Sequence, residues 1–294
     1  MAPEWREMPS LPAPQQENAV VASSGKVFVI GGFGASVQAT TAVAVFDPGT
    51  KQWSAAAPLP EPLHHVNAAV VGKRIFVVGA LRGLAFEAVG TTLVYDADTN
   101  AWSPKKSMPA GSERGSSFVG AIGNVIYVAG GLRKESVADV SSYDTDKDEW
   151  SGPLPPLPAP LDHGMSAVFG DKLYAIGGRN GITGHVTTVN VFDPKAPAWT
   201  PRTPMPTSRG GAMASIAKGV VVVAGGEGNT EDPNGIFHET EAYDPVADRW
   251  FSLPPMRTPR HGTGAATVGD VVYVPGGGIQ QAFGQSAIFE ALFF

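Results

Sequence analysis

The stretch VFVIGG, residues 27–32, is the first of six segments in which a short β-branched or aromatic run ends in a pair of small residues. Runs of this kind, bounded by glycine, are typical of buried β-strands. Successive pairs begin 48, 51, 47, 48 and 51 residues apart. The pairs are Gly31-Gly32, Gly79-Ala80, Gly130-Gly131, Gly177-Gly178, Gly225-Gly226 and Gly276-Gly277. This regular spacing indicates a repeat architecture.

A second motif follows each glycine pair, an aromatic residue next to an acid, and in five units a tryptophan comes six or seven residues later. Turn-forming Asp, Pro and Gly residues lie between the two. The aromatic-acid pairs are Phe46-Asp47, Tyr95-Asp96, Tyr143-Asp144, Phe192-Asp193, Tyr243-Asp244 and Phe289-Glu290, and the tryptophans are Trp53, Trp102, Trp150, Trp199 and Trp250. The pattern therefore predicts that each unit forms a four-stranded antiparallel meander, which is the form of a propeller blade.

The order Gly-Gly, aromatic-Asp, turn, Trp resembles the Kelch repeat, and the resemblance covers essentially the whole chain. It implies an all-β fold, a six-bladed β-propeller of four-stranded antiparallel blades. We expect one domain over residues 1–294, with blades at about 12–60, 61–109, 110–156, 157–206, 207–256 and 257–294 plus 1–11.

The last unit ends before its fourth strand and its tryptophan, but a matching segment stands at the start of the chain. Trp5 precedes Trp53 by 48 residues, which is one repeat. We predict that the N-terminal strand completes the last blade, which would remove an open sheet edge.

Composition excludes several classes of function. The net charge of −6 disfavours non-specific nucleic-acid binding, which needs a large cationic field. The absence of cysteine excludes thiolate metal sites and thiolate nucleophiles.

No apolar stretch approaches the length of a membrane span, so we expect no membrane partner. The N-terminus lacks a signal-peptide pattern, which favours a cytoplasmic protein; export followed by signal removal is the alternative.

Binding residues tend to lie on variable loops over a rigid scaffold. In a meander these are the loops between second and third strands and the connections between blades. Two short windows of each repeat reach this side, just before the first strand and just after the glycine pair. They contain six arginines among the 21 Lys and Arg residues, and four of the six histidines, so a basic mouth is expected. The predicted ligand-binding residues are Arg82, Arg114, Arg133, Arg179, Asn180, Arg209, Arg260, His64, His163 and His261.

Two interpretations of these arginines stay open. An arginine fork suits a carboxylate or phosphate, which favours an anion site. In Kelch proteins an arginine before the first strand often braces the ring instead, and this alternative applies to Arg114, Arg209 and Arg260. The neighbours His64 and His65 point to opposite faces if they lie on a strand, so they do not both ligate one metal without a bulge. We expect no metal and no cofactor.

The resemblance implies a module that binds an acidic peptide or a small carboxylate-bearing ligand, and we expect a monomer. The alternative is a carbohydrate-active enzyme, such as the sialic-acid epimerases found among six-bladed Kelch proteins. In that case an acid on the loop side would move the proton, and the candidates are Glu17, Asp162 and Glu227. Kelch-type galactose oxidases need a Cys-Tyr cofactor, and a chain without cysteine excludes them.

Overall fold

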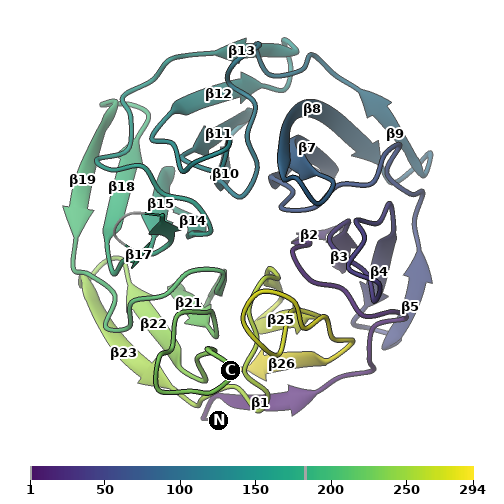
Figure 1. The fold of residues 1–294 in the computed structure, drawn as a ribbon, viewed down its shortest axis with the longest axis vertical. Helices are drawn as coiled ribbons and strands as arrows, with labels where there is room; N and C mark the ends of the chain where they lie inside the picture. Colours follow the sequence, from purple (N-terminus) through teal and green to yellow (C-terminus); the bar gives the residue numbers. More distant parts are fainter. Residues whose placement is uncertain (1, 182–183) are drawn as a thin grey trace. The chain divides into compact units, whose positions relative to one another are not determined.

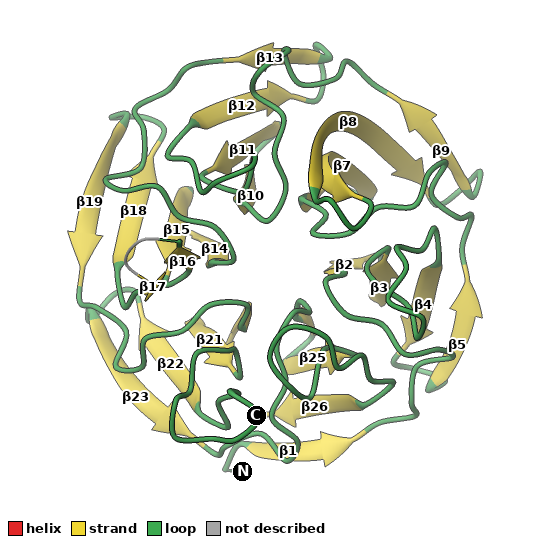
Figure 2. Cartoon of the chain, viewed as in Figure 1, coloured by secondary structure: helices red, strands yellow, loops and turns green. Residues whose placement is uncertain are grey.

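The computed structural model of the chain describes residues 2–181 and 184–294. This part of the chain consists of strands and loops and contains no helix (Figure 2). The chain divides into two compact units: unit 1 comprises Met1–His64 and Gly211–Phe294, and unit 2 comprises His65–Gly210. Each unit contains three four-stranded antiparallel blades (Figure 1). The predicted all-β fold of six such blades is confirmed, while the assignment of residues 1–294 to one domain stays a prediction.

The blades of unit 2 are meanders in which strands that follow one another along the blade pair antiparallel. The first consists of β6 (Ala68–Val71), β7 (Arg74–Arg82), β8 (Glu87–Asp96) and β9 (Ala101–Pro104). The second consists of β10 (Phe118–Ile122), β11 (Val125–Ala129), β12 (Val140–Asp144) and β13 (Glu149–Ser151). The third consists of β14 (Met165–Phe169), β15 (Lys172–Ile176), β18 (Val189–Asp193) and β19 (Ala198–Arg202), and a small hairpin of β16 (Arg179–Asn180) and β17 (Gly184–His185) adjoins it.

The blades of unit 1 follow the same plan, except that one of them joins the two ends of the chain. The first consists of β2 (Ala19–Ser23), β3 (Lys26–Ile30), β4 (Val43–Asp47) and β5 (Gln52–Ala55). The second consists of β20 (Met213–Ala217), β21 (Val220–Ala224), β22 (Thr240–Asp244) and β23 (Arg249–Leu253). The third consists of β24 (Ala266–Val268), β25 (Val271–Pro275), β26 (Phe289–Phe293) and β1 (Glu4–Glu7).

The predicted closure by the N-terminal strand is confirmed. Strand β1 pairs antiparallel with β26, from Glu4 opposite Phe293 to Glu7 opposite Glu290. In Figure 1 the purple start of the chain and its yellow end lie side by side in this blade. The edge of β26 is therefore covered by main-chain pairing, which removes a template for association with other chains.

One detail of the repeat was assigned wrongly in the last blade. In the first blade Phe46 of the aromatic-acid pair lies opposite Trp53, but Trp5 lies opposite Leu292. Leu292 and Phe293 thus occupy the positions expected for Phe289 and Glu290. Phe289 instead packs in the adjoining core, with its ring 4.8 Å from that of Phe46. The physical reason is that register is set by strand pairing and by which face is buried, whereas the one aromatic-acid pair in β26 lies three residues before the position that pairs with Trp5.

Tryptophans of the repeat connect outer strands to the segment that precedes the blade. Trp150 packs against Tyr143 with ring centroids 5.2 Å apart, and its indole N–H donates to the carbonyl of Lys106 at 2.8 Å. Trp199 donates in the same way to the carbonyl of Pro155 at 2.9 Å. An aromatic side chain with one polar edge suits this place, since its ring packs against the core of the blade and its N–H pairs with a linker carbonyl.

Candidate functional site

The loop end of a blade is the end at which its second strand runs into the loop toward its third strand, and at which the chain enters its first strand. In unit 2 each blade has one residue with a positive φ at this entry: His65 and His163 at 50° and Ser116 at 53°. The N–H of Ser116 donates to the carbonyl of His65 at 2.9 Å, and that of His163 to the carbonyl of Ser116 at 3.2 Å. Non-glycine residues rarely adopt this conformation, although histidine does so more often than most. A repeated main-chain turn therefore presents these three side chains in equivalent directions.

The same turn recurs in unit 1, where two of its three positions are glycine. Gly211, Gly262 and Glu17 have φ values of 58°, 62° and 54°. The N–H of Gly262 donates to the carbonyl of Gly211 at 2.8 Å, and the N–H of Glu17 donates to the carbonyl of Gly262. Only Glu17 among these three places a functional group at the entry turn of unit 1.

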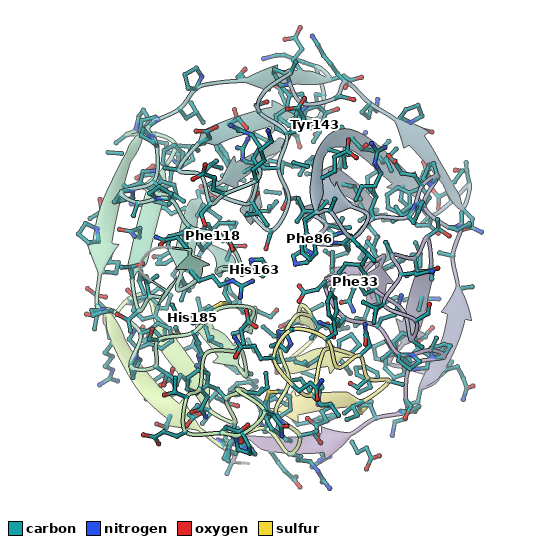
Figure 3. The ribbon with its side chains drawn as sticks, viewed as in Figure 1. Phe33, Phe86, Phe118, Tyr143, His163 and His185 are labelled. Atoms are coloured by element: carbon teal, nitrogen blue, oxygen red, sulfur yellow. The ribbon has the colours of Figure 1, made fainter. Side chains whose placement is uncertain are left out.

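His163, which is labelled in Figure 3, belongs to a buried polar cluster in unit 2. Its Nδ1 contacts Oδ1 of Asp162 in a short hydrogen bond, and the other carboxylate oxygen accepts a short hydrogen bond from Ser136 Oγ. Its Nε2 faces Nε2 of His65 at 2.9 Å. The exposed fractions of Asp162, His163 and His65 are 4%, 8% and 6%. A carboxylate bonded to Nδ1 fixes the orientation of the imidazole ring and directs Nε2 toward His65.

The charge state of Asp162 reflects this network. Burial by itself raises the pKa of the Asp162 carboxyl, but the hydrogen bond and charge of His163, together with Ser136 and Arg179, lower that pKa below its usual value. Asp162 is thus held as a carboxylate beside His163.

Arg179 joins this cluster from the loop that follows the glycine pair. Its main chain forms two hydrogen bonds with Asp162, each of 2.9 Å. Its Nε lies 3.7 Å from Oδ1 of Asp162, and one terminal nitrogen lies 3.3 Å from Nε2 of His163. Its side chain is 34% exposed, while that of Asp162 is 6% exposed. The neighbouring Asn180 donates from its side chain to the carbonyl of Pro160 at 3.1 Å.

The other two predicted loop arginines also belong to unit 2, and each has a carboxylate partner in its own blade. Arg82 pairs with Glu87 at 2.8 Å across the tip of the β7–β8 hairpin. Arg133 pairs with Asp139 at 2.6 Å, and its Nε donates to the carbonyl of Glu113 at 3.1 Å. The three loop arginines are therefore partly neutralised, which weakens the basic field that the sequence suggested.

The three predicted arginines that precede first strands are completely buried, with exposed fractions of 0% for Arg114, Arg209 and Arg260. Arg114 donates to the carbonyls of Gly130, Ser112 and Val128, and burial lowers its pKa to about 10. Arg260 bonds three main-chain carbonyls in the same manner and pairs with the buried carboxylate of Glu290 at 2.9 Å. The contacts of Arg114 and Arg260 fit the bracing interpretation, and Arg209 is equally buried, so we do not include the three arginines in the binding surface proposed below.

The remaining predicted residues lie in unit 1. His261 Nδ1 is 3.5 Å from a carboxylate oxygen of Glu227 and 4.0 Å from one of Glu17, and its Nε2 contacts the carbonyl of Gln280 at 2.9 Å. Glu227 and His261 are 3% and 2% exposed. His64 is fully buried and stacks on Phe33 with ring centroids 4.2 Å apart, which makes it a core residue of this unit. Two acid candidates of unit 1 thus share one histidine, while Asp162 has its own in unit 2.

Two residues of the unit 2 cluster, His65 and Ser136, were absent from the predicted binding set. His65 precedes His163 by 98 residues, or two repeats, so aligning the units places the two at equivalent positions. Ser136 lies in a loop of variable length, and no spacing in the sequence connects it with Asp162.

Comparison with known proteins bears on the whole chain. A family model described as the KLHDC2/KLHL20/DRC7 Kelch-repeats domain matches residues 3–156 and 88–277. The chain belongs to the Kelch-repeat family. Among its relatives, Kelch-like protein terF of Aspergillus terreus is 34% identical over 298 residues, which cover 94% of this chain and 65% of that protein. Human Kelch-like protein 23 is 26% identical over 259 residues, covering 87% of this chain and 44% of that protein.

The Kelch chain thus spans about two thirds of the fungal relative and under half of the human one. The structure titled "Structure of YjhT" matches with a TM-score of 0.80 at 17% identity and covers 97% of this chain and 96% of that one. This likeness shows the fold alone, a six-bladed β-propeller. Among the described residues, no helix has the length and apolar character to cross a membrane.

Proposed function

We propose that this Kelch protein binds a protein partner through the loop ends of unit 2 and recognises an acidic segment of that partner with Arg133 and Arg179. Kelch propellers typically bind proteins. The observation that carries the finer proposal is that all three loop arginines belong to unit 2, one in each of its blades. An acidic segment in an extended conformation would contact them in turn, because each arginine fork donates hydrogen bonds to one carboxylate.

These arginines can bind a carboxylate of the partner protein if it replaces the carboxylate with which they pair in the free protein. The side chain of Arg133 is 30% exposed and that of its partner Asp139 is 52% exposed. An exposed pair of this kind stabilises the fold by about 0–1 kcal/mol, so a partner carboxylate can replace Asp139 at small cost. Arg179 is held on two sides by Asp162 and His163, so less side-chain freedom is lost when it binds.

An apolar contact lies beside Arg82. Leu84, at the tip of the β7–β8 hairpin, is 66% exposed. Strands β7 and β8 have nine and ten residues, whereas the second and third strands of the other blades have five, so this hairpin extends further. Peptide recognition commonly combines such an apolar anchor with charged contacts. We therefore expect an acidic segment that also carries a large apolar side chain.

A fluorescent 15-residue peptide of alternating Glu and Gly with one central Leu tests this proposal in an anisotropy titration. Its counterpart with Lys in place of Glu is the charge control. We expect Arg133→Ala and Arg179→Ala each to weaken binding about tenfold, the loss of one charged hydrogen bond. Arg202→Ala, which removes an exposed arginine from the outer strand β19, should leave binding unchanged. Equal affinity for both peptides, or equal effects of all three variants, would contradict the proposal.

The Asp162–His163 pair supports a second candidate, an enzyme that epimerises or mutarotates a sugar acid. A histidine oriented by a carboxylate is a common general base. Proton NMR of sialic acid freshly dissolved as one anomer would measure whether the protein speeds its equilibration. Enzyme function requires acceleration that Asp162→Asn reduces by at least tenfold while Arg202→Ala does not. The uncatalysed rate in the presence of wild-type protein would reject this candidate for that substrate class.

A further inference from the structure

We propose that His65 and His163 form a binding site for a divalent transition-metal ion in unit 2. The sequence predicted no metal site for the neighbours His64 and His65, because two adjacent residues on a strand would point to opposite faces. The structure instead pairs His65 with His163, two repeats along the chain, with their Nε2 atoms 2.9 Å apart. The proposal does not rest on recognition of an acidic partner.

The main chain directs both imidazoles to one point. Each histidine has a φ of 50°, and each takes part in the hydrogen bonds of the repeated entry turn through Ser116. Their rings meet edge to face, with centroids 4.8 Å apart and an interplanar angle of 76°. Residues with positive φ are uncommon outside glycine and persist where the surrounding structure fixes them, often at functional sites.

The second contacts of His163 prepare it as a ligand. Its Nδ1 bonds the Asp162 carboxylate, which in turn accepts from Ser136. A protein metal site typically has this arrangement, in which the ring nitrogen that is not bound to metal donates to a carboxylate. With the proton on Nδ1, Nε2 carries a lone pair directed at His65. A terminal nitrogen of Arg179, 3.3 Å away, is a donor to the same atom.

The geometry requires a small adjustment. Imidazole nitrogens bind Zn²⁺ at about 2.0 Å, and two of them in tetrahedral coordination stand about 3.3 Å apart. The observed 2.9 Å would therefore lengthen by about 0.4 Å as the ion replaces the proton between the rings. The ion would also displace the Arg179 contact. Two imidazoles favour Zn²⁺, Co²⁺, Ni²⁺ or Cu²⁺ over Mg²⁺ and Ca²⁺, and water or a carboxylate would complete the coordination.

Isothermal titration of the full, tag-free and chelator-treated chain with Zn²⁺ tests the site, and Co²⁺ absorption in the visible range reports nitrogen coordination. We expect one ion per chain, at least tenfold weaker binding in His65→Asn and His163→Asn, and unchanged binding in His238→Ala, which removes an exposed histidine. Asparagine is chosen because it tolerates positive φ, and circular dichroism would verify that each variant is folded.

Arg179→Ala distinguishes this site from adventitious binding to surface histidines. Because the arginine competes for Nε2 of His163, its removal should tighten Zn²⁺ binding several-fold. A structural role of the histidine pair alone would not produce this gain. The proposal is overturned if Zn²⁺ does not bind, if folded His65→Asn and His163→Asn bind it as the wild type does, or if His238→Ala abolishes binding.

Discussion

Replacement of Trp5 by alanine should destabilise the protein about as much as the loss of a central core residue, although Trp5 lies near the start of the chain. The indole is 4% exposed and packs with Met213, Met256 and Leu292 in one core cluster of unit 1. Its N–H donates to the carbonyl of Pro254 at 2.9 Å. The effect follows from closure of the last blade by strand β1.

Truncation of a buried tryptophan costs about 3–5 kcal/mol, which includes the cavity that remains. At about 2–4 °C per kcal/mol for a chain of this size class, the expected drop in Tm is roughly 6–20 °C. Phe251→Ala is the matched control, because this aromatic residue lies on the adjacent blade of the same unit and is 42% exposed. Its cost should stay within about 0.5 kcal/mol, as for most surface substitutions.

Differential scanning calorimetry together with urea denaturation would measure both variants and a chain that lacks residues 1–11. We expect the truncated chain to lose at least as much stability as Trp5→Ala and to associate more readily, since the edge of β26 becomes unpaired. If Trp5→Ala unfolded at the same temperature and urea concentration as Phe251→Ala, the closing strand would contribute nothing and the reasoning would be refuted.

Three further predictions concern the scaffold. Gly32→Ala should lower stability by at least about 2 kcal/mol, because φ is +91° and a Cβ atom would meet the main-chain carbonyl of Gln16. Gly72→Ala should lower it by about 1 kcal/mol, because φ is +62° but the space around the Cβ atom is open. The midpoints of urea denaturation would compare the two variants. Glu290→Ala should lower stability by about 3–5 kcal/mol, since it leaves the buried guanidinium of Arg260 without its carboxylate partner. Glu290→Gln should lower stability less, because its amide oxygen still accepts a hydrogen bond. Equal losses in the two variants would argue against this explanation. Hydrogen bonds from main-chain N–H groups and lysines lower the pKa of three turn carboxylates, Asp47, Asp144 and Asp193. The stability that they contribute is present above about pH 4 and is lost as the pH falls through their folded-state pKa values. Joint replacement of the three by Asn should therefore flatten the loss of Tm between about pH 5 and pH 2.

The fold could be predicted because six units carry the same signals at the same spacing. A strand run that ends in two glycines is weak evidence alone, but its repetition determines the number of blades and, through Trp5, the closing strand. The error at Phe289 and Glu290 shows the limit of such patterns. The position opposite Trp5 belongs to Leu292, three residues after Phe289, and only the pairing of β26 with β1 and β25 sets this register.

The candidate site was less predictable, because its chemistry depends on contacts that repeat spacing does not encode. The sequence placed Arg133 and Arg179 at loop ends, but the carboxylate partner of each depends on the course of its own loop. The pairing of His65 with His163 depends on a positive φ at both residues, and two neighbouring histidines in a sequence do not reveal it. Full burial of Arg114 likewise follows from main-chain carbonyls that converge on it, and no residue type indicates those.

Hydrogen–deuterium exchange with and without the Glu-rich peptide tests most directly whether the loop ends of unit 2 form the binding surface. When the Glu-rich peptide is present, we predict slower exchange in the proteolytic fragments of the protein that contain residues 112–116 and 132–139. Glu113, Arg133 and Asp139 lie together in these segments. The outer strand β19 should exchange at the same rate in both samples. Protection confined to unit 1 or to outer strands, with the loops of unit 2 unchanged, would contradict the proposed function.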